Sequence, residues 1–359
     1  MTRVLALFSG SLASRTAARL VERHPAVGAV SLIHFRSPFA SDLDDLRELM
    51  KTEWAGVPFR TQSLKREYRR FIDSAPEFSL IRSCMNCRLL QLTRAARYMQ
   101  RIKADYLVTG DRIGLHGVEL EDLACVTEQA GLEGRILRPL CHDVSRRLRG
   151  LEEWTSLEPK RCGAIEESAV SALGRSLGLD PRDPLSSECR CKLTVPGFGE
   201  RAANLFEEEG FTLNGLRLLD FALYYKIDPD TKVVLALSEG EKHQLQTLFL
   251  PQDLRVYHSA PHGPMALVRT DWSSKTDAER QRVIELAARI TATHVSSGRA
   301  TSVAVYFRLE SDDETLLVNA QPFSSCDEMA ALTGVEAMAL PGRQVVQAVF
   351  SHRKMSMRT

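Results

Sequence analysis

The sequence predicts an α/β protein, with a doubly wound parallel sheet followed by a second, smaller α+β domain. Apolar runs of strand length alternate with amphipathic helical patterns from the N-terminus to about residue 178. At 359 residues the chain is also long for a single hydrophobic core. Beyond a turn-rich stretch at residues 180–187 the regular alternation stops, which indicates a separate domain.

The expected elements follow from apolar spacing. In the first domain, short apolar runs predict strands at residues 4–8, 29–35, 59–62 and 104–110. Helical spacing of apolar residues predicts helices at residues 14–22, 42–51 and 85–103. In the second domain, strands are expected at residues 232–237, 301–307 and 314–320, with a helix at residues 278–293.

Composition narrows the possible partners and compartment. The net charge is +1, so binding to nucleic acid would need local patches such as the basic clusters at residues 65–70 and 146–149. The N-terminus carries no long apolar signal region, and no apolar run is long enough to cross a bilayer. We therefore expect a cytoplasmic protein with no membrane partner. Its eight cysteines should then be reduced thiols, metal ligands or redox groups.

Two small-residue turns end expected strands of the first domain. Backbone N–H groups at the start of a helix bind anions, and doubly wound sheets bind ligands at the carboxyl ends of their strands. Both turns are therefore candidate ligand sites, and the first is a candidate phosphate loop. The candidate residues are Ser9, Gly10, Ser11, Ser14, Thr109 and Gly110.

The cysteines suggest a second site. Cys84 and Cys87 form a CxxC at the start of the 85–103 helix, which fits a metal half-site, a redox pair favoured by the helix dipole, or two unrelated buried thiols. Cys189 and Cys191 form another close pair with charged neighbours. Thiolates from both segments could hold an iron–sulfur cluster, and all four could hold a structural zinc ion. Cys125 and Cys141 each have apolar neighbours and are expected in the core.

In their order and spacing, these motifs resemble the PP-loop ATPase superfamily, specifically the tRNA thiouridine synthetases, over residues 1–200. Residues 9–14 stand where that family has S-G-G-x-D-S, and the CxxC and the T-G pair follow in the family's order. Residues 133–140 and 191–198 resemble the family segments around its last cysteine, C-L-L-T-x-P-x-F. Residues 205–350 resemble the NFACT-type RNA-binding domain, through residues 228–235 and 262–268; a small α+β domain of another role is the alternative.

The resemblance implies a HUP-like fold and a sulfurtransferase. Such enzymes use ATP and Mg²⁺ to adenylate a uridine of tRNA and then place sulfur on the activated carbon. The serines and glycines named above would bind ATP, and a sulfur-donor protein would be a partner. Cys87 and Cys191 would be catalytic. Cys84, Cys87 and Cys191 would hold sulfur or a [4Fe-4S] cluster, with zinc as the alternative.

The chain departs from the family pattern where ATP would bind. Ser11 replaces the second glycine, and Ala13 replaces the aspartate. A methyl group cannot hold a magnesium-bound water, which puts Mg²⁺ in doubt. After Gly110, residues 111–117 lack the Gly-Gln and Ser-Gln pattern of the family. Two interpretations therefore stay open: an ATP-dependent sulfurtransferase, or a catalytically degenerate RNA- or cluster-binding relative that has lost ATP turnover.

Overall fold

The computed structural model divides into two compact units, Met1–Thr194 and Val195–Thr359. The residues that it describes are 1–40, 44–64, 67–68, 80–142, 150–180, 191–194, 198–228, 230–295, 301–325 and 327–329. Several of the features named above lie outside these ranges: Cys189, the cluster at residues 146–149, and the cluster at residues 65–70 apart from Glu67 and Tyr68.

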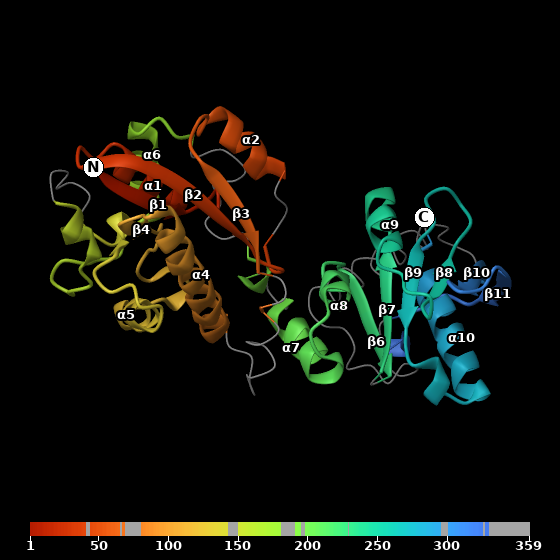
Figure 1. Ribbon diagram of the computed structural model, residues 1–359. Coiled ribbons are helices and arrows are strands. Elements are labelled where there is room, and N and C mark those ends of the chain that lie inside the picture. Colours follow the sequence, from red (N-terminus) through yellow and green to blue (C-terminus); the bar gives the residue numbers. More distant parts are fainter. Residues whose placement is uncertain are drawn as a thin grey trace. The chain divides into compact units, whose positions relative to one another are not determined.

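A parallel sheet forms the centre of the first unit (Figure 1). Leu5 pairs with Ser31 on one side and with Leu107 on the other, so β1 is the central strand. The chain adds β2 and β3 on one side of β1 and then β4 and β5 on the other. This arrangement confirms the predicted doubly wound α/β class. The strand order is β3-β2-β1-β4-β5, with β1 (Thr2–Leu7), β2 (Val27–Arg36), β3 (Phe59–Ser63), β4 (Tyr106–Val108) and β5 (Ile136–Leu137).

Helices cover both faces of this sheet. Figure 1 shows α1 (Leu12–Glu22) and α6 (Glu167–Ser176) on one face, with α4 (Leu80–Ile102) and α5 (Leu120–Gln129) on the other. The helix α2 (Asp44–Thr52) adds apolar side chains to the α1 side of the core. Phe8, at the end of β1, packs edge-on against Trp54 at 5.4 Å between ring centroids. Burying each such side chain stabilises the unit by roughly 1.5–3 kcal/mol, and this anchors the β1–α1 loop.

The helix α4 begins five residues earlier than the sequence predicts. It starts at Leu80, so Cys84 and Cys87 lie inside the helix instead of at its opening. No glycine or proline interrupts residues 80–84, which allows the helix to extend upstream. The field of a helix terminus acts mainly within its first turn. The position of α4 therefore does not support the alternative in which the helix dipole favours a thiolate of the CxxC pair.

The second unit is an α+β domain built on an antiparallel sheet of six strands. The sequence predicts three of these strands and the long helix, but it misses β6, β8 and β9. Both β8 and β9 are short, and pairing with their neighbours defines them as strands. The strand order is β11-β10-β8-β9-β7-β6, with β6 (Leu223–Asp228), β7 (Thr231–Ala236), β8 (Leu254–Tyr257), β9 (Met265–Arg269), β10 (Val303–Leu309) and β11 (Leu316–Ala320).

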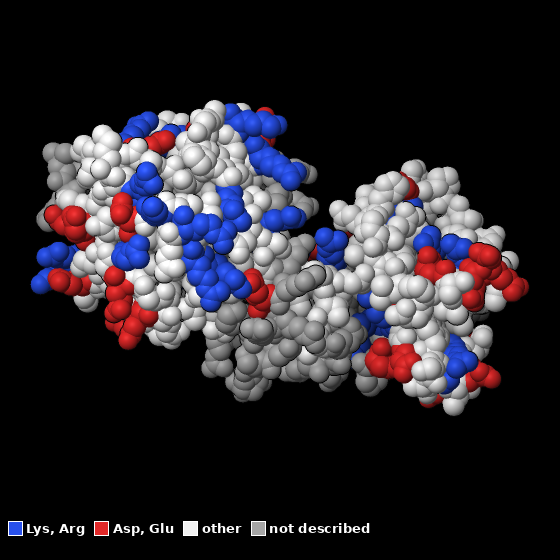
Figure 2. Space-filling model, in the orientation of Figure 1, with Lys and Arg blue, Asp and Glu red and all other residues white. Residues whose placement is uncertain are grey.

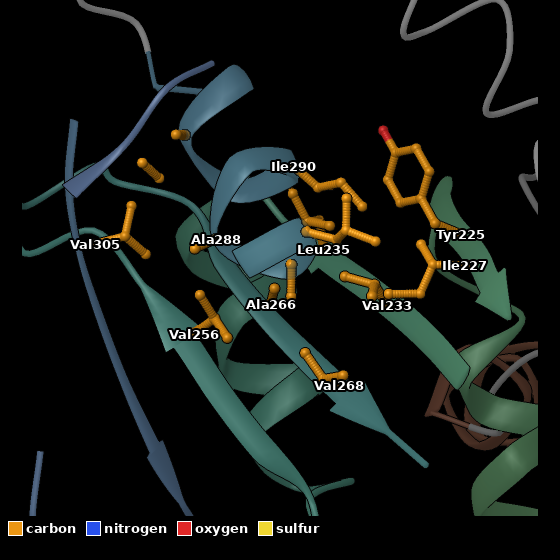
Figure 3. Close-up of a cluster of buried hydrophobic side chains, with 14 of the residues drawn as sticks. Tyr225, Ile227, Val233, Leu235, Val256, Ala266, Val268, Ala288, Ile290 and Val305 are labelled. Atoms are coloured by element: carbon orange, nitrogen blue, oxygen red, sulfur yellow. The ribbon is translucent and has the colours of Figure 1, made fainter. Parts of the chain in front are cut away.

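The main core of this unit lies between the sheet and α10 (Asp277–Thr293). Figure 3 shows Val233, Leu235 and Ala266 of the sheet close to Ala288 and Ile290 of the helix. Side chains of β7 and β9 on the opposite face form a smaller core with α8 (Leu213–Leu218) and α9 (Glu239–Gln246); α7 (Phe198–Glu209) precedes them. None of the helices in the described ranges has both the length and the apolar character needed to cross a membrane.

Candidate functional site

The loop between β1 and α1 gathers three hydroxyl groups at the start of a helix. The Oγ atoms of Ser9 and Ser11 are 2.9 Å apart, and Ser9 Oγ donates to Ser14 Oγ at 3.1 Å. Ser11 is the N-cap of α1, and its hydroxyl accepts from the Ser14 N–H at 3.4 Å. Gly10 has a φ of +86°, a conformation that favours glycine, and an added Cβ would lie 3.0 Å from Leu46. The predicted phosphate loop is thus a tight turn lined with hydroxyls.

The end of β4 lies directly against this loop. A Cβ on Gly110 would lie 2.7 Å from the backbone N of Ser14 and the carbonyl carbon of Ala13, so only glycine allows this approach. Thr109 is 3% exposed, and its Oγ1 has no hydrogen-bond partner among the residues that the structure describes. A buried hydroxyl without a partner costs free energy unless a ligand satisfies it. The structure therefore brings the two predicted ligand-binding turns together between β1 and β4, where the winding of the sheet reverses.

The residue after Gly110 carries a buried carboxylate that is already neutralised. Asp111 forms ion pairs with Arg88 of α4 and with Arg138, which follows β5. The Arg138 Nη2 also donates to Thr127 Oγ1 at 2.7 Å. Burial lowers the pKa of Arg138 to about 10, so this guanidinium remains charged at neutral pH and needs its partner. With Asp111 committed to two arginines and Ala13 apolar, these residues do not fit a Mg²⁺ site of the PP-loop kind.

Cys87 lies on α4 with two hydrogen-bond donors at its sulfur. The Tyr68 Oη is 2.7 Å from Cys87 Sγ, and Gln91 Nε2 donates to the same sulfur at 3.2 Å. Burial raises the pKa of the Cys87 thiol, whereas the hydrogen bonds from Tyr68 and Gln91 lower it. Burial also raises the pKa of Tyr68, and the neighbouring Cys87 acts in the same direction. The Tyr68 hydroxyl therefore stays protonated and can donate to a thiolate.

Cys191 reaches the same side of the unit through the segment after β2. It forms an antiparallel bridge with Ala40, and the Lys192 N–H donates to the Phe39 carbonyl at 2.7 Å. The Phe39 ring packs edge-on against Tyr68 at 5.6 Å, and Tyr68 contacts Cys87. A chain of contacts thus joins the segment of Cys191 to Cys87.

The cysteines do not form a closed metal site in the part of the chain that the structure describes. There, no three His, Cys, Asp or Glu side chains lie close enough together to hold a metal ion. Cys84 and Cys87 are both half-buried and three residues apart on α4. Cys189 lies outside the described residues. The described cysteines alone therefore do not fit a [4Fe-4S] cluster or a four-ligand zinc ion.

The Arg88–Asp111 ion pair connects the helix of Cys84 and Cys87 to the loop between β1 and α1. Arg88 follows Cys87 on α4, while Asp111 follows Gly110, which packs on Ser14. Sequence patterns do not identify Tyr68, whose contact with Cys87 spans 19 residues of chain. Two other contributors had a sequence signal: Gln91 lies one helical turn after Cys87, and Asp111 directly follows the T-G pair.

Two further cysteines differ in their surroundings. Cys141 is fully buried and its thiol donates to the Asp111 carbonyl at 3.3 Å. Cys125 is exposed, which contradicts the expectation that it belongs to the core. The neighbouring Leu123 and Val126 of α5 are the residues that face inward.

No family model and no curated protein matches this chain. Among solved structures, it is similar to the NMN synthetase from Francisella tularensis, with 14% identity, 60% of this chain and 82% of that chain covered, and a TM-score of 0.33. The U34-tRNA thiolase NcsA from Methanococcus maripaludis, with its [4Fe-4S] cluster, shows 17% identity, 61% and 73% coverage, and a TM-score of 0.30. A predicted subunit of tRNA methyltransferase from Methanocaldococcus jannaschii shows 14% identity, 54% and 97% coverage, and a TM-score of 0.30. Similarities at this level assign no activity to this chain.

Proposed function

We propose that this chain is a tRNA-modifying sulfurtransferase of the PP-loop type. Its first unit binds ATP between β1 and β4, adenylates a uridine carbonyl oxygen, and delivers sulfur from the cysteines of α4. The observation that carries the proposal is the Arg88–Asp111 ion pair, because it ties the turn of Cys87 to the loop beside Ser14. An activated carbon and a sulfur nucleophile need to meet at one place, and this pair links their two sites.

The β1–α1 loop supplies the groups that ATP phosphates require. Backbone N–H groups at the start of α1 and the hydroxyls of Ser9, Ser11 and Ser14 would face the phosphates. The unpartnered Thr109 hydroxyl supports a ligand here, because a phosphate oxygen could accept its hydrogen bond. The close approach at Gly110 packs the T-G turn directly against the start of α1, so both turns border one site. No step of the proposal depends on Mg²⁺, which the residues at positions 13 and 111 do not fit.

Cys87 would carry the sulfur. A persulfide from a donor protein passes its outer sulfur to Cys87, and that sulfur attacks the adenylated carbon as AMP leaves with the carbonyl oxygen. Attack by the Cys84 thiolate on the inner sulfur then releases the thiolated base and leaves a Cys84–Cys87 disulfide for an external thiol to reduce. Tyr68 and Gln91 stabilise the negative charge on sulfur during these steps.

A resident cluster or zinc ion would change the sulfur carrier but not the nucleotide site. The resemblance would make Cys84, Cys87 and Cys191 its ligands, although no three His, Cys, Asp or Glu side chains of the described residues lie close enough together to hold one ion. Elemental analysis of the purified protein separates the possibilities. Iron with acid-labile sulfide supports the cluster, one zinc ion per chain supports a structural site, and neither metal supports the persulfide route above.

The state of the β1–α1 loop favours a second candidate function, a degenerate relative without ATP turnover. The loop hydroxyls already bond to one another, Ser11 occupies the Ser14 N–H, and Ala13 supplies no carboxylate. The test measures ATP affinity and RNA-dependent pyrophosphate release in the native protein and in an Ala13→Asp, Ser11→Gly variant. Thiolated uridine is measured alongside, because pyrophosphate release reports adenylation and not the transfer of sulfur.

Pyrophosphate release together with thiolated uridine in the native protein supports the sulfurtransferase. Turnover that appears only in the Ala13→Asp, Ser11→Gly variant supports the degenerate relative with an intact scaffold. Absence of nucleotide binding in both forms would reject the proposed ATP site. The Gly163→Ala variant is a matched control, because an added Cβ there meets nothing within 4 Å.

A further inference from the structure

The helix α4 carries a strongly basic surface that the chemistry at Cys87 does not use. Its sequence contains five arginines and no Asp or Glu. Arg97 and Arg101 are exposed, as is Arg60 on the edge strand β3. Figure 2 shows Lys and Arg side chains gathered over α4 on this face of the first unit. Within the described part of the chain, none of these three arginines forms a hydrogen bond or an ion pair.

Arg101 lies on the same side of the helix as Cys87, and Arg97 lies one turn before Arg101. From Cys87, successive steps of seven, four and three residues lead to Arg94, Tyr98 and Arg101. This spacing keeps the four side chains in one stripe along α4. At 1.5 Å per residue, the stripe from Cys87 to Arg101 is roughly 21 Å long. A chain lying along the arginines would therefore be led toward the sulfur of Cys87.

The segment at residues 60–68 supports this stripe. The Arg60 guanidinium lies over the Tyr98 ring, 4.9 Å from its centroid, and Glu67 pairs with Arg94. The cation–π contact holds Arg60 beside α4 while its charge remains exposed. Arg60, Arg97 and Arg101 thus form a pre-arranged basic surface, which we name the α4 surface.

The distribution of charge over the sequence points to the first unit as the site of polyanion binding. Residues 1–194 contain 30 Lys and Arg against 25 Asp and Glu, whereas residues 195–359 contain 17 against 21. An anionic membrane is a poorer fit than a nucleic acid, because membrane-surface helices insert apolar side chains. The exposed large hydrophobic residues of the described chain are Met1, Leu213, Leu316 and Leu317, and none belongs to α4 or β3.

We infer that the α4 surface binds the phosphate backbone of the RNA substrate and directs a nucleotide of that RNA to Cys87. The identity of the RNA as tRNA rests on the proposed function, whereas the contact with phosphate rests on the α4 surface alone. Unpaired guanidinium groups on a rigid helix are suited to phosphate because each can donate two parallel hydrogen bonds.

The test measures tRNA affinity of the full chain by fluorescence anisotropy over a series of salt concentrations. The slope of log K against log salt is negative, and each lost phosphate contact makes it shallower by about 0.7–0.9. Replacing Arg60, Arg97 and Arg101 by Gln should therefore make the slope less negative by about 2–3, with affinity about 100-fold lower at 0.1 M salt if the curves meet near 1 M. Replacing the same three by Lys should preserve most of the slope.

A matched control removes the same charge elsewhere. Arg175, Arg217 and Arg282 are exposed on other helices, and their triple Gln variant should change the slope by much less. The inference would be overturned by equal effects of the two Gln variants or by an unchanged slope in the α4 variant. It would also be overturned if the native chain did not bind tRNA. Loss of binding to phosphatidylserine vesicles with tRNA binding intact would also overturn it. Thermal unfolding checks that every variant folds.

Failure of this inference can be separated from failure of the proposed function. ATP affinity and pyrophosphate release report on the loop between β1 and β4, which the α4 variant leaves unaltered. Salt-dependent tRNA binding through the α4 surface without thiolation would reject the sulfurtransferase and keep the RNA surface. Thiolation that survives the triple Gln substitution with native tRNA affinity would keep the sulfurtransferase and reject the surface.

Discussion

Replacing Tyr68 by Phe should make Cys87 a weaker acid and a slower nucleophile. The substitution removes the hydroxyl 2.7 Å from the Cys87 sulfur and leaves the ring that packs on Phe39. A hydrogen bond to a charged group contributes about 1.5–3 kcal/mol, and one pKa unit corresponds to about 1.4 kcal/mol. The pKa of Cys87, already raised by burial, should therefore rise by about one to two further units. The thiolate fraction at neutral pH should fall about 10- to 100-fold.

The assay follows alkylation of Cys87 by iodoacetamide as a function of pH, with mass spectrometry of the peptide that contains it. Cys125 is an internal reference, because it is exposed and its sulfur also accepts from a glutamine one turn along its helix, at 3.1 Å. In the Tyr68→Phe variant, the midpoint for Cys87 should move to higher pH while that of Cys125 stays constant.

A Phe39→Leu variant is the matched control, since it alters the ring contact and keeps the hydroxyl. If Phe39→Leu moves the Cys87 midpoint as far as Tyr68→Phe does, packing and not the hydrogen bond sets the acidity. An unchanged midpoint in Tyr68→Phe would refute the role assigned to the tyrosine.

Asp111→Ala should lower the free energy of unfolding by about 3–5 kcal/mol in urea titrations, because it leaves the buried charge of Arg138 without its carboxylate; a loss under about 1 kcal/mol would contradict this. Gly110→Ala should destabilise by about 1–3 kcal/mol and weaken pyrophosphate binding, since its Cβ would overlap the start of α1, whereas Gly163→Ala should alter neither. Burial raises the pKa of Cys141 from 9.0 to about 12, so as the pH rises the thiol is deprotonated in the unfolded chain before it is deprotonated in the folded chain. The stability that Cys141 contributes is complete below about pH 9 and falls as the pH approaches 12; Cys141→Ala should flatten that fall, and an unaltered pH profile would disprove it.

Much of the fold and part of the site could be predicted from the sequence. The alternation of apolar runs and helical patterns identified the doubly wound sheet, because burial imposes a period of two or of 3.6 on each element locally. Gly10 and Gly110 stood out as small residues at strand ends, and both turn out to lie where a side chain would clash or strain the backbone. The acid missing at Ala13 was also evident from the sequence alone.

The contacts around Cys87 and Asp111 depend on tertiary structure. The pairing of Tyr68 with Cys87, and of Arg88 with Asp111, joins segments whose separation in sequence carries no periodic signal. The alternative of a CxxC pair at the opening of a helix is not supported because α4 starts at Leu80, directly after Ser79, a residue type favoured at helix N-caps.

The sequence by itself therefore determined the α/β class, the two candidate turns and the cysteines proposed as sulfur carriers, since these follow from local periodicity and residue chemistry. Only the tertiary structure decided that Thr109 is a buried hydroxyl with no partner in the described part of the chain, and that Asp111 is neutralised by two arginines. It also decided that Arg60 lies beside α4, which carries Arg97 and Arg101. The physical reason is that burial and charge pairing depend on which strands and helices become neighbours. In a doubly wound sheet, that is set by the strand order and not by position along the chain.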